Sequence, residues 1–107
     1  MKHDIDPTIL YKFDTLQSFL LEKQDCKSFL RVVLSATSEP ETVLSIIFNG
    51  VMNLQISALC DSNLLQIEIE NIRSWQQEDL FYKVTEAEYE TFSFCCKSYD
   101  FDILKKI

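Results

Sequence analysis

Hydrophobic residues recur along this chain at two different spacings, and the spacing changes near residue 27. From Asp6 to Lys23 they recur three and four positions apart, which predicts an amphipathic helix. Asp6 can cap this helix, and Pro7 suits its first turn. Asp14 can alternatively cap a second, shorter helix, so a break at this residue stays open. The apolar stripe consists of Ile9, Leu10, Phe13, Leu16, Phe19 and Leu20.

From residue 27 onward apolar and polar residues alternate, which is the period of a β-strand. Short polar links separate the alternating segments, and such links favour antiparallel neighbours. We therefore predict an α+β fold, with an N-terminal helix packed on a six-stranded, mainly antiparallel sheet arranged as a meander. The six predicted strands cover about residues 29–34, 43–48, 52–58, 65–69, 80–84 and 92–103.

Asn49-Gly50 is the strongest hairpin signal in the chain. A tight turn there would place Ile46 beside Asn53, so two explanations stay open. Either the strand at 43–48 is covered on both faces, or the turn carries an extra residue. The apolar residues on both faces of that strand favour a central position in the sheet.

The apolar phase slips near the C-terminal end of the chain. Phe92, Phe94 and Cys96 occupy even positions, whereas the apolar residues from Tyr99 onward occupy odd positions. A bulge or bend near residues 97–98 would reconcile the two phases.

Composition adds limits to this picture. The 107 residues are 47% hydrophobic, which predicts a single domain, 1–107, with a packed core. The net charge is -7, and residues 61–102 hold ten acidic side chains against three basic ones. Such a surface repels nucleic acid and anionic membranes and attracts basic proteins, although solubility alone also explains it.

The N-terminal residues lack the apolar segment of a signal peptide, and no apolar stretch is long enough to span a bilayer. We therefore expect a cytoplasmic protein whose four cysteines are free thiols. The adjacent Cys95 and Cys96 should point to opposite faces of a strand.

Few residues suggest catalysis or metal binding. His3 is the only histidine, the cysteines lack metal-ligand spacing, and one glycine cannot form a phosphate-binding loop. Glu68 and Glu70 share one strand face, roughly 7 Å apart, which is within the range of inverting glycosidases. A solvated strand face has the same pattern, so we predict no enzyme, no cofactor and no metal site.

An interaction surface is the alternative role for these carboxylates. Trp75 lies in a polar segment with further acids, where it either covers the edge of the core or anchors a partner. The predicted partner-binding residues are Glu68, Glu70, Trp75, Glu78 and Asp79, with Gln66 and Tyr82 as neighbours.

Residues 43–96 resemble small bacterial immunity proteins of contact-dependent growth inhibition and other polymorphic toxin systems. The pattern consists of Phe48-Asn49-Gly50-Val51 and the alternating strand after it, Leu65-x-Ile67-x-Ile69, Tyr82-x-Val84-Thr85-x-x-Glu88 and Phe92-x-Phe94-x-Cys96. The resemblance implies a short N-terminal helix with an antiparallel sheet, and a cytoplasmic inhibitor that occludes the active site of one cognate toxin. A basic toxin, such as a nuclease, would suit the acidic surface. The alternatives are a small adaptor or assembly subunit, for example a homodimer formed through a sheet edge, and last an enzyme.

Overall fold

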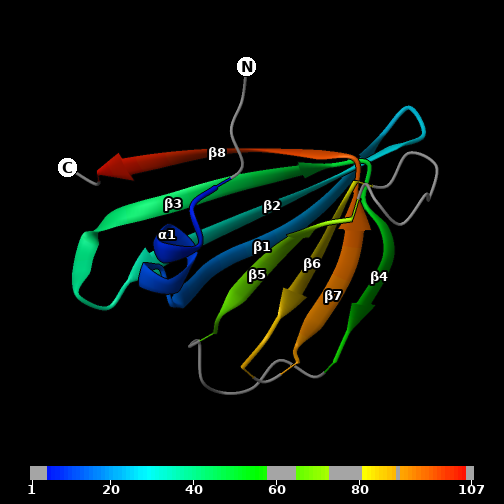
Figure 1. The fold of residues 1–107 in the computed structure, drawn as a ribbon. Helices are drawn as coiled ribbons and strands as arrows, with labels where there is room; N and C mark the ends of the chain where they lie inside the picture. Colours follow the sequence, from blue (N-terminus) through cyan, green and yellow to red (C-terminus); the bar gives the residue numbers. More distant parts are fainter. Residues whose placement is uncertain (1–4, 58–64, 73–80, 89, 106–107) are drawn as a thin grey trace.

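The computed structural model describes residues 5–57, 65–72, 81–88 and 90–105, which form one short helix and eight strands (Figure 1). The elements are α1 (Pro7–Lys12), β1 (Thr15–Gln24), β2 (Lys27–Ala36), β3 (Glu39–Asn49), β4 (Met52–Ile56), β5 (Ile67–Asn71), β6 (Tyr82–Glu86), β7 (Phe92–Cys96) and β8 (Ser98–Lys105). Within these residues no helix is long and apolar enough to cross a membrane.

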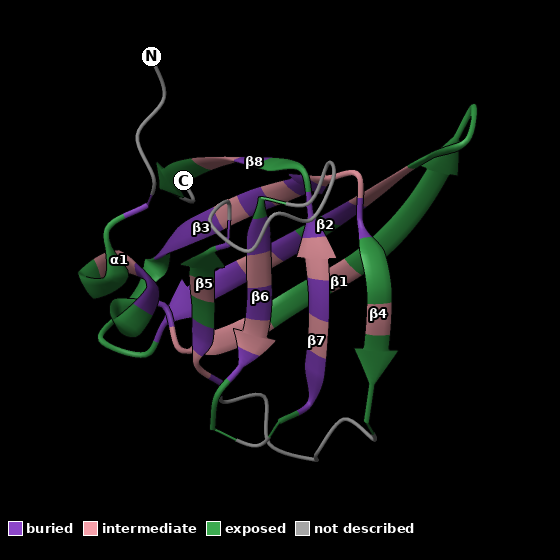
Figure 2. Cartoon of the chain, turned by 45° about the vertical axis from the view of Figure 1, so that its right-hand side comes forward, coloured by how far each residue is buried: buried purple, intermediate pink, exposed green. Residues whose placement is uncertain are grey.

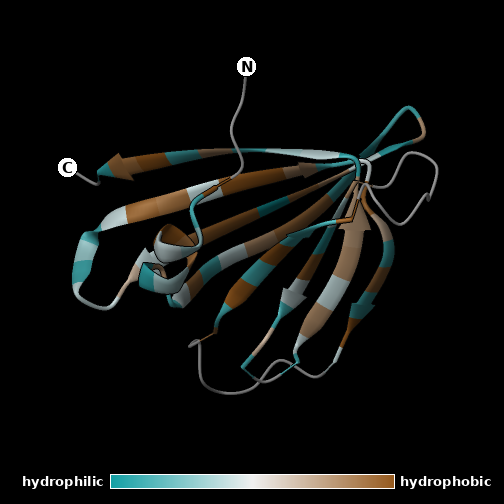
Figure 3. Ribbon diagram, in the orientation of Figure 1, coloured by the Kyte–Doolittle hydropathy of each residue, from teal (hydrophilic) through white to brown (hydrophobic). Residues whose placement is uncertain are grey.

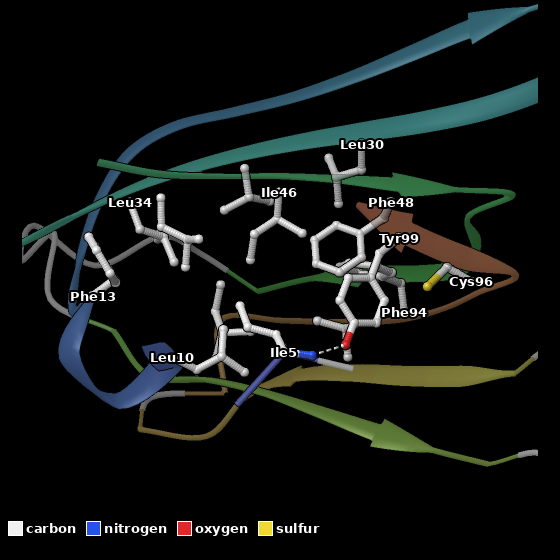
Figure 4. Close-up of a cluster of buried hydrophobic side chains, with 14 of the residues drawn as sticks. Ile5, Leu10, Phe13, Leu30, Leu34, Ile46, Phe48, Phe94, Cys96 and Tyr99 are labelled. Atoms are coloured by element: carbon white, nitrogen blue, oxygen red, sulfur yellow. Dashed lines mark hydrogen bonds between the residues drawn. The ribbon is translucent and has the colours of Figure 1, made fainter. Parts of the chain in front are cut away.

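The strands form two antiparallel sheets of four strands each. The first sheet has the order β1-β2-β3-β8, and the second has the order β4-β7-β6-β5. The sheets fan apart from the end where β7 passes into β8, and the hydrophobic side chains of both fill the space between them (Figure 1, Figure 4). The predicted α+β fold, with a helix on one six-stranded meander, is therefore wrong, because sheet packs against sheet in a mainly β structure.

The predicted helix from Asp6 to Lys23 is too long. Asp6 does cap α1, because its side chain accepts a hydrogen bond from the Thr8 N–H at 2.9 Å, but the helix ends at Lys12. The residues after Asp14 form β1, which pairs with β2 along its length through a two-residue turn at Asp25 and Cys26. The apolar residues of this segment suit either a helix or a strand. Pairing with β2 gives its backbone groups hydrogen-bond partners, whereas a short helix is only marginally stable in water.

Asp14 marks the predicted break, although a strand follows it. Its carboxylate accepts hydrogen bonds from the Thr37 N–H at 3.1 Å, the Thr37 hydroxyl at 2.9 Å and the Thr15 hydroxyl at 3.2 Å. Burial on its own would raise the pKa of Asp14, but these hydrogen bonds outweigh it and lower the pKa below the ordinary value. Asp14 thus joins the start of β1 to the turn between β2 and β3.

The predicted hairpin at Asn49-Gly50 is also wrong. β3 lies between β2 and β8, so neither of its edges is open to β4, and the central position predicted for this strand is confirmed. β3 carries its hydrophobic residues between Val43 and Phe48 (Figure 3). At Gly50, with φ +66°, the chain instead leaves the first sheet for the second.

The phase slip near residues 97–98 is confirmed, and it marks the second passage between the sheets. Lys97 is a bend between β7 and β8, and its N–H donates to the Asn49 carbonyl at 2.9 Å. The two passages therefore touch: a Cβ added to Gly50 would lie 2.7 Å from Cγ of Lys97. Even-numbered residues face the core in β7, and odd-numbered residues face it at the start of β8. Cys96 and Tyr99 therefore both point inward.

The core lies between the two sheets and extends under α1. Phe48 of β3 packs edge-on against Phe94 of β7, with ring centroids 5.0 Å apart, and Tyr99 of β8 lies 5.9 Å from Phe48 (Figure 4). The Tyr99 hydroxyl accepts a hydrogen bond from the Ile5 N–H at 2.8 Å, which fixes the segment before α1. Leu10 of α1 is buried in the same cluster.

Cys95 and Cys96 point to opposite faces of β7, as predicted, and the described cysteines are free thiols. Burial, together with the neighbouring Cys95, raises the pKa of the Cys96 thiol to about 12. We expect iodoacetamide at pH 8 to modify the exposed Cys26 readily and to leave Cys96 unmodified until the protein is unfolded. Peptide mass mapping over time checks this, and equal rates at the two cysteines in the folded protein would contradict the packing of β7.

Candidate functional site

The outward face of the second sheet is polar, because alternate residues of its strands point away from the core. Figure 2 shows this sheet in front of the first, with buried and partly exposed positions alternating along β6 and β7. We call this surface the polar face; it comprises Gln55, Glu68, Glu70, Lys83, Thr85 and Ser93.

The strand register orders the polar face into rows. Glu68 lies opposite Thr85, and Thr85 lies opposite Ser93 on β7. Glu70 lies opposite Lys83, so one of the two β5 carboxylates has a cation as its cross-strand neighbour. Glu68, by contrast, has the uncharged Thr85 as its cross-strand neighbour.

Two shallow hollows flank β5 and β6. One, of about 480 Å³, lies over the polar face and reaches Glu90 beyond it. The other, of about 700 Å³, lies between α1 and β5 and includes the exposed Tyr11. Both are lined by Glu68, Lys83 and Thr85, so the two hollows adjoin on the polar face.

A buried carboxylate beneath the polar face joins the segments that border it. Glu86 is 1% exposed, and its oxygens accept hydrogen bonds from the backbone N–H groups of Gln66 at 2.9 Å, Glu88 at 2.8 Å and Thr91 at 3.3 Å. The Thr91 hydroxyl donates a fourth, at 3.2 Å. Glu86 therefore fixes the start of β5 against the turn between β6 and β7.

The prediction from the sequence missed Glu86, because the predicted strand ends at residue 84. The available signal was parity: Glu86 continues the alternation of Tyr82 and Val84, both of which are buried. An acidic residue on the inward parity of a strand indicates a buried carboxylate that must find donors.

The structure brings part of the predicted interaction set together. Glu68 and Glu70 are exposed on β5, and Gln66 is half-buried just before it. Tyr82 points the other way, into the core, where its ring packs edge-on against Tyr99 at 5.0 Å. Trp75, Glu78 and Asp79 lie outside the described residues, and the partner-binding role of the whole set stays a prediction.

The exposure of Glu68 and Glu70 bears on the glycosidase alternative. A catalytic acid is usually held in a site that shields it from water and alters its pKa. Two carboxylates on an open strand face are better placed to meet a charged surface than to transfer protons to a bound substrate. The geometry therefore favours recognition of a partner.

Comparison with known protein families gives a match over most of the chain. A family model described as "Immunity protein PIM8" matches residues 6–102. No curated protein and no solved structure matches the chain. The matched range includes α1, all of β1 to β7, and residues 98–102 of β8.

Proposed function

The chain belongs to the PIM8 immunity protein family, and from this premise we propose that it binds one cognate toxin domain and neutralises it by covering the toxin's active site. Such inhibition is stoichiometric and requires no reaction. The proposal also places the protein in the cytoplasm, with a toxin of the contact-dependent or another polymorphic class as its partner.

The observation that carries the proposal is the polar face with its exposed acids. The inward side chains of the second sheet are buried in the core. Glu68, Glu70 and Glu90 are exposed on or beside the outer face of this sheet. With a net charge of -7, the protein would attract a basic toxin domain and accelerate its association. A toxin that cleaves nucleic acid binds phosphates with basic side chains, and a carboxylate surface can occupy that surface in place of phosphate.

The test is charge reversal on β5. We expect Glu68→Lys/Glu70→Lys to bind a toxin domain encoded by a gene next to its own about tenfold more weakly at low salt, because two attractions become repulsions. The difference should shrink as salt is added, since exposed charges are screened. Isothermal titration calorimetry at two salt concentrations, together with protection of cells that express the toxin, measures the effect.

The matched control reverses two acids on the outer face of the other sheet. Glu22→Lys/Asp102→Lys changes the net charge by the same amount, and both residues are exposed on β1 and β8. We expect this variant to keep near-native affinity. Equal weakening in the two variants would mean that net charge alone attracts the toxin, and full affinity of the β5 variant would remove the polar face from the interface.

A further inference from the structure

β5 forms one edge of the second sheet. Among the described residues it pairs with β6 on one side and with no strand on the other, and Figures 1 and 2 show it as the outermost strand, facing α1. An open edge of this kind is a template for a further strand, and proteins that do not use such an edge usually cover or shorten it.

The hydrogen bonds show which backbone groups of β5 face the open side. The Ala87 N–H donates to the Gln66 carbonyl and the Ile72 N–H to the Phe81 carbonyl, both at 2.8 Å. Along an antiparallel strand, every second residue forms its backbone hydrogen bonds with a given neighbouring strand. In β5 the even-numbered residues therefore form theirs with β6. The N–H and C=O of Ile67 and Ile69 therefore point to the open edge.

These outward groups are only partly satisfied. The Ile67 carbonyl accepts a weak hydrogen bond from the Gln66 side-chain amide at 3.3 Å. The N–H and C=O of Ile69 have no partner among the described residues. Ile69 lines the hollow of about 700 Å³ between α1 and β5, so there is open space beside this part of the edge.

The side chains around this edge define what the added strand should carry. Glu68 and Glu70 flank the edge on the outer face, and lysine or arginine on the incoming strand would pair with them. On the inner side the hollow is bordered by the half-buried Ile69 and by the exposed ring of Tyr11, which suit apolar side chains. A strand that alternates basic and apolar residues matches both faces, because side chains on a strand alternate with period two.

We propose that the toxin contributes such a basic and apolar strand, and that this strand extends the second sheet by pairing with the open edge of β5. The inference rests on the proposed function and specifies how the partner is held. Main-chain hydrogen bonds to Ile67 and Ile69 would supply affinity, and contacts to Glu68 and Glu70 would supply register and selectivity.

The first measurement is amide hydrogen exchange in the wild-type protein, with and without an inactive form of the toxin domain used in the charge-reversal test. We expect the Ile69 amide to exchange rapidly in the free protein and at least about tenfold more slowly in the complex, because a new strand would protect it. The amide of Ile56, which faces the opposite open edge of the same sheet, should not change.

The second measurement compares proline variants. Ile69→Pro removes a donor that β6 does not use, and it should weaken toxin binding by about tenfold or more. The matched control is Ile56→Pro on β4: the Ser57 N–H bonds to Thr91, so the Ile56 N–H also points away from the sheet. Ile56→Pro should change affinity less than about twofold. Ile69→Ala, which keeps the N–H, separates the loss of the side chain from the loss of the donor.

Each outcome decides one of the two claims. If the wild-type protein binds and neutralises the toxin but the Ile69 amide is not slowed, the strand pairing is overturned and the proposed function stands. If the wild-type protein does not bind the toxin, the proposed function fails and the inference fails with it. If the free protein sediments as a dimer that Ile69→Pro converts to a monomer, a second copy occupies the edge and the inference is overturned. If Ile69→Pro does not fold, as circular dichroism would show, the exchange measurement still decides.

Discussion

Replacing Phe48 with alanine is expected to lower the free energy of unfolding by about 3–5 kcal/mol, the cost of deleting a fully buried aromatic ring. Phe48 has no exposed surface, and its ring joins the two sheets by packing edge-on against Phe94 at 5.0 Å. Nearby rings fix the positions of Phe94 and Tyr99, so the cavity cannot collapse without moving a strand. Because small domains are stable by about 5–15 kcal/mol, this variant should be close to unfolding at 37 °C.

Urea unfolding followed by far-ultraviolet circular dichroism measures the loss as a lower midpoint with an unchanged slope. Phe29→Ala is the matched control, since Phe29 is a half-buried phenylalanine on the outward parity of the same sheet, next to Asn49 in the register. We expect this control to cost less than half as much. Equal costs would show that the space between the sheets is not the main core.

Glu86→Gln is expected to lower the free energy of unfolding by about 2–4 kcal/mol, although the side chain keeps its size. Gln66 and Glu88 donate to Oε2 of Glu86, whereas both donors of Thr91 go to Oε1. An amide has one acceptor oxygen. In either orientation of glutamine, an NH₂ group would therefore face at least one backbone N–H, and a buried donor would lose its partner.

Thermal unfolding should report this change as a melting temperature lower by about 10 °C or more. Glu88→Gln is the matched control, because it makes the same change in an exposed glutamate two residues away. We expect its melting temperature to stay within about 2 °C of the wild type. The toxin-binding surface should also loosen in Glu86→Gln, because the start of β5 is held by this carboxylate. Wild-type stability in Glu86→Gln would mean that Glu86 does not organise the turn between β6 and β7.

The candidate site illustrates how far the alternating pattern can be used. Alternation along residues 65–70 placed Glu68 and Glu70 on one exposed strand face, and the structure agrees. The same rule placed Phe92, Phe94 and Cys96 inward, which is confirmed. Tyr82 was assigned to the interaction surface as a sequence neighbour, against its own parity, and it lies in the core. Parity was the better guide because it follows directly from the geometry of the strand.

Strand pairing was not predictable in the same way. Asn49-Gly50 has the local chemistry of a hairpin turn, yet β8, from the other end of the chain, occupies the edge that β4 would need. The segment from Thr15 to Gln24 has apolar residues that suit a helix, yet β2 offers it a partner of equal length. In both cases a contact between segments distant in sequence outweighed a local preference, as tertiary context commonly does.

The sequence by itself determined most of the strand segments, the inward or outward direction of their side chains, the cap of α1, the acidic charge and membership of an immunity protein family. These properties depend on residues that are close in the chain or on its composition as a whole. Only the tertiary structure decided that two sheets form where one was expected, that Gly50 and Lys97 are adjoining passages between them, that Glu86 is buried, and that β5 has an open edge. Those properties depend on which strands compete for the same hydrogen-bonding edges, and that competition is settled when distant parts of the chain meet.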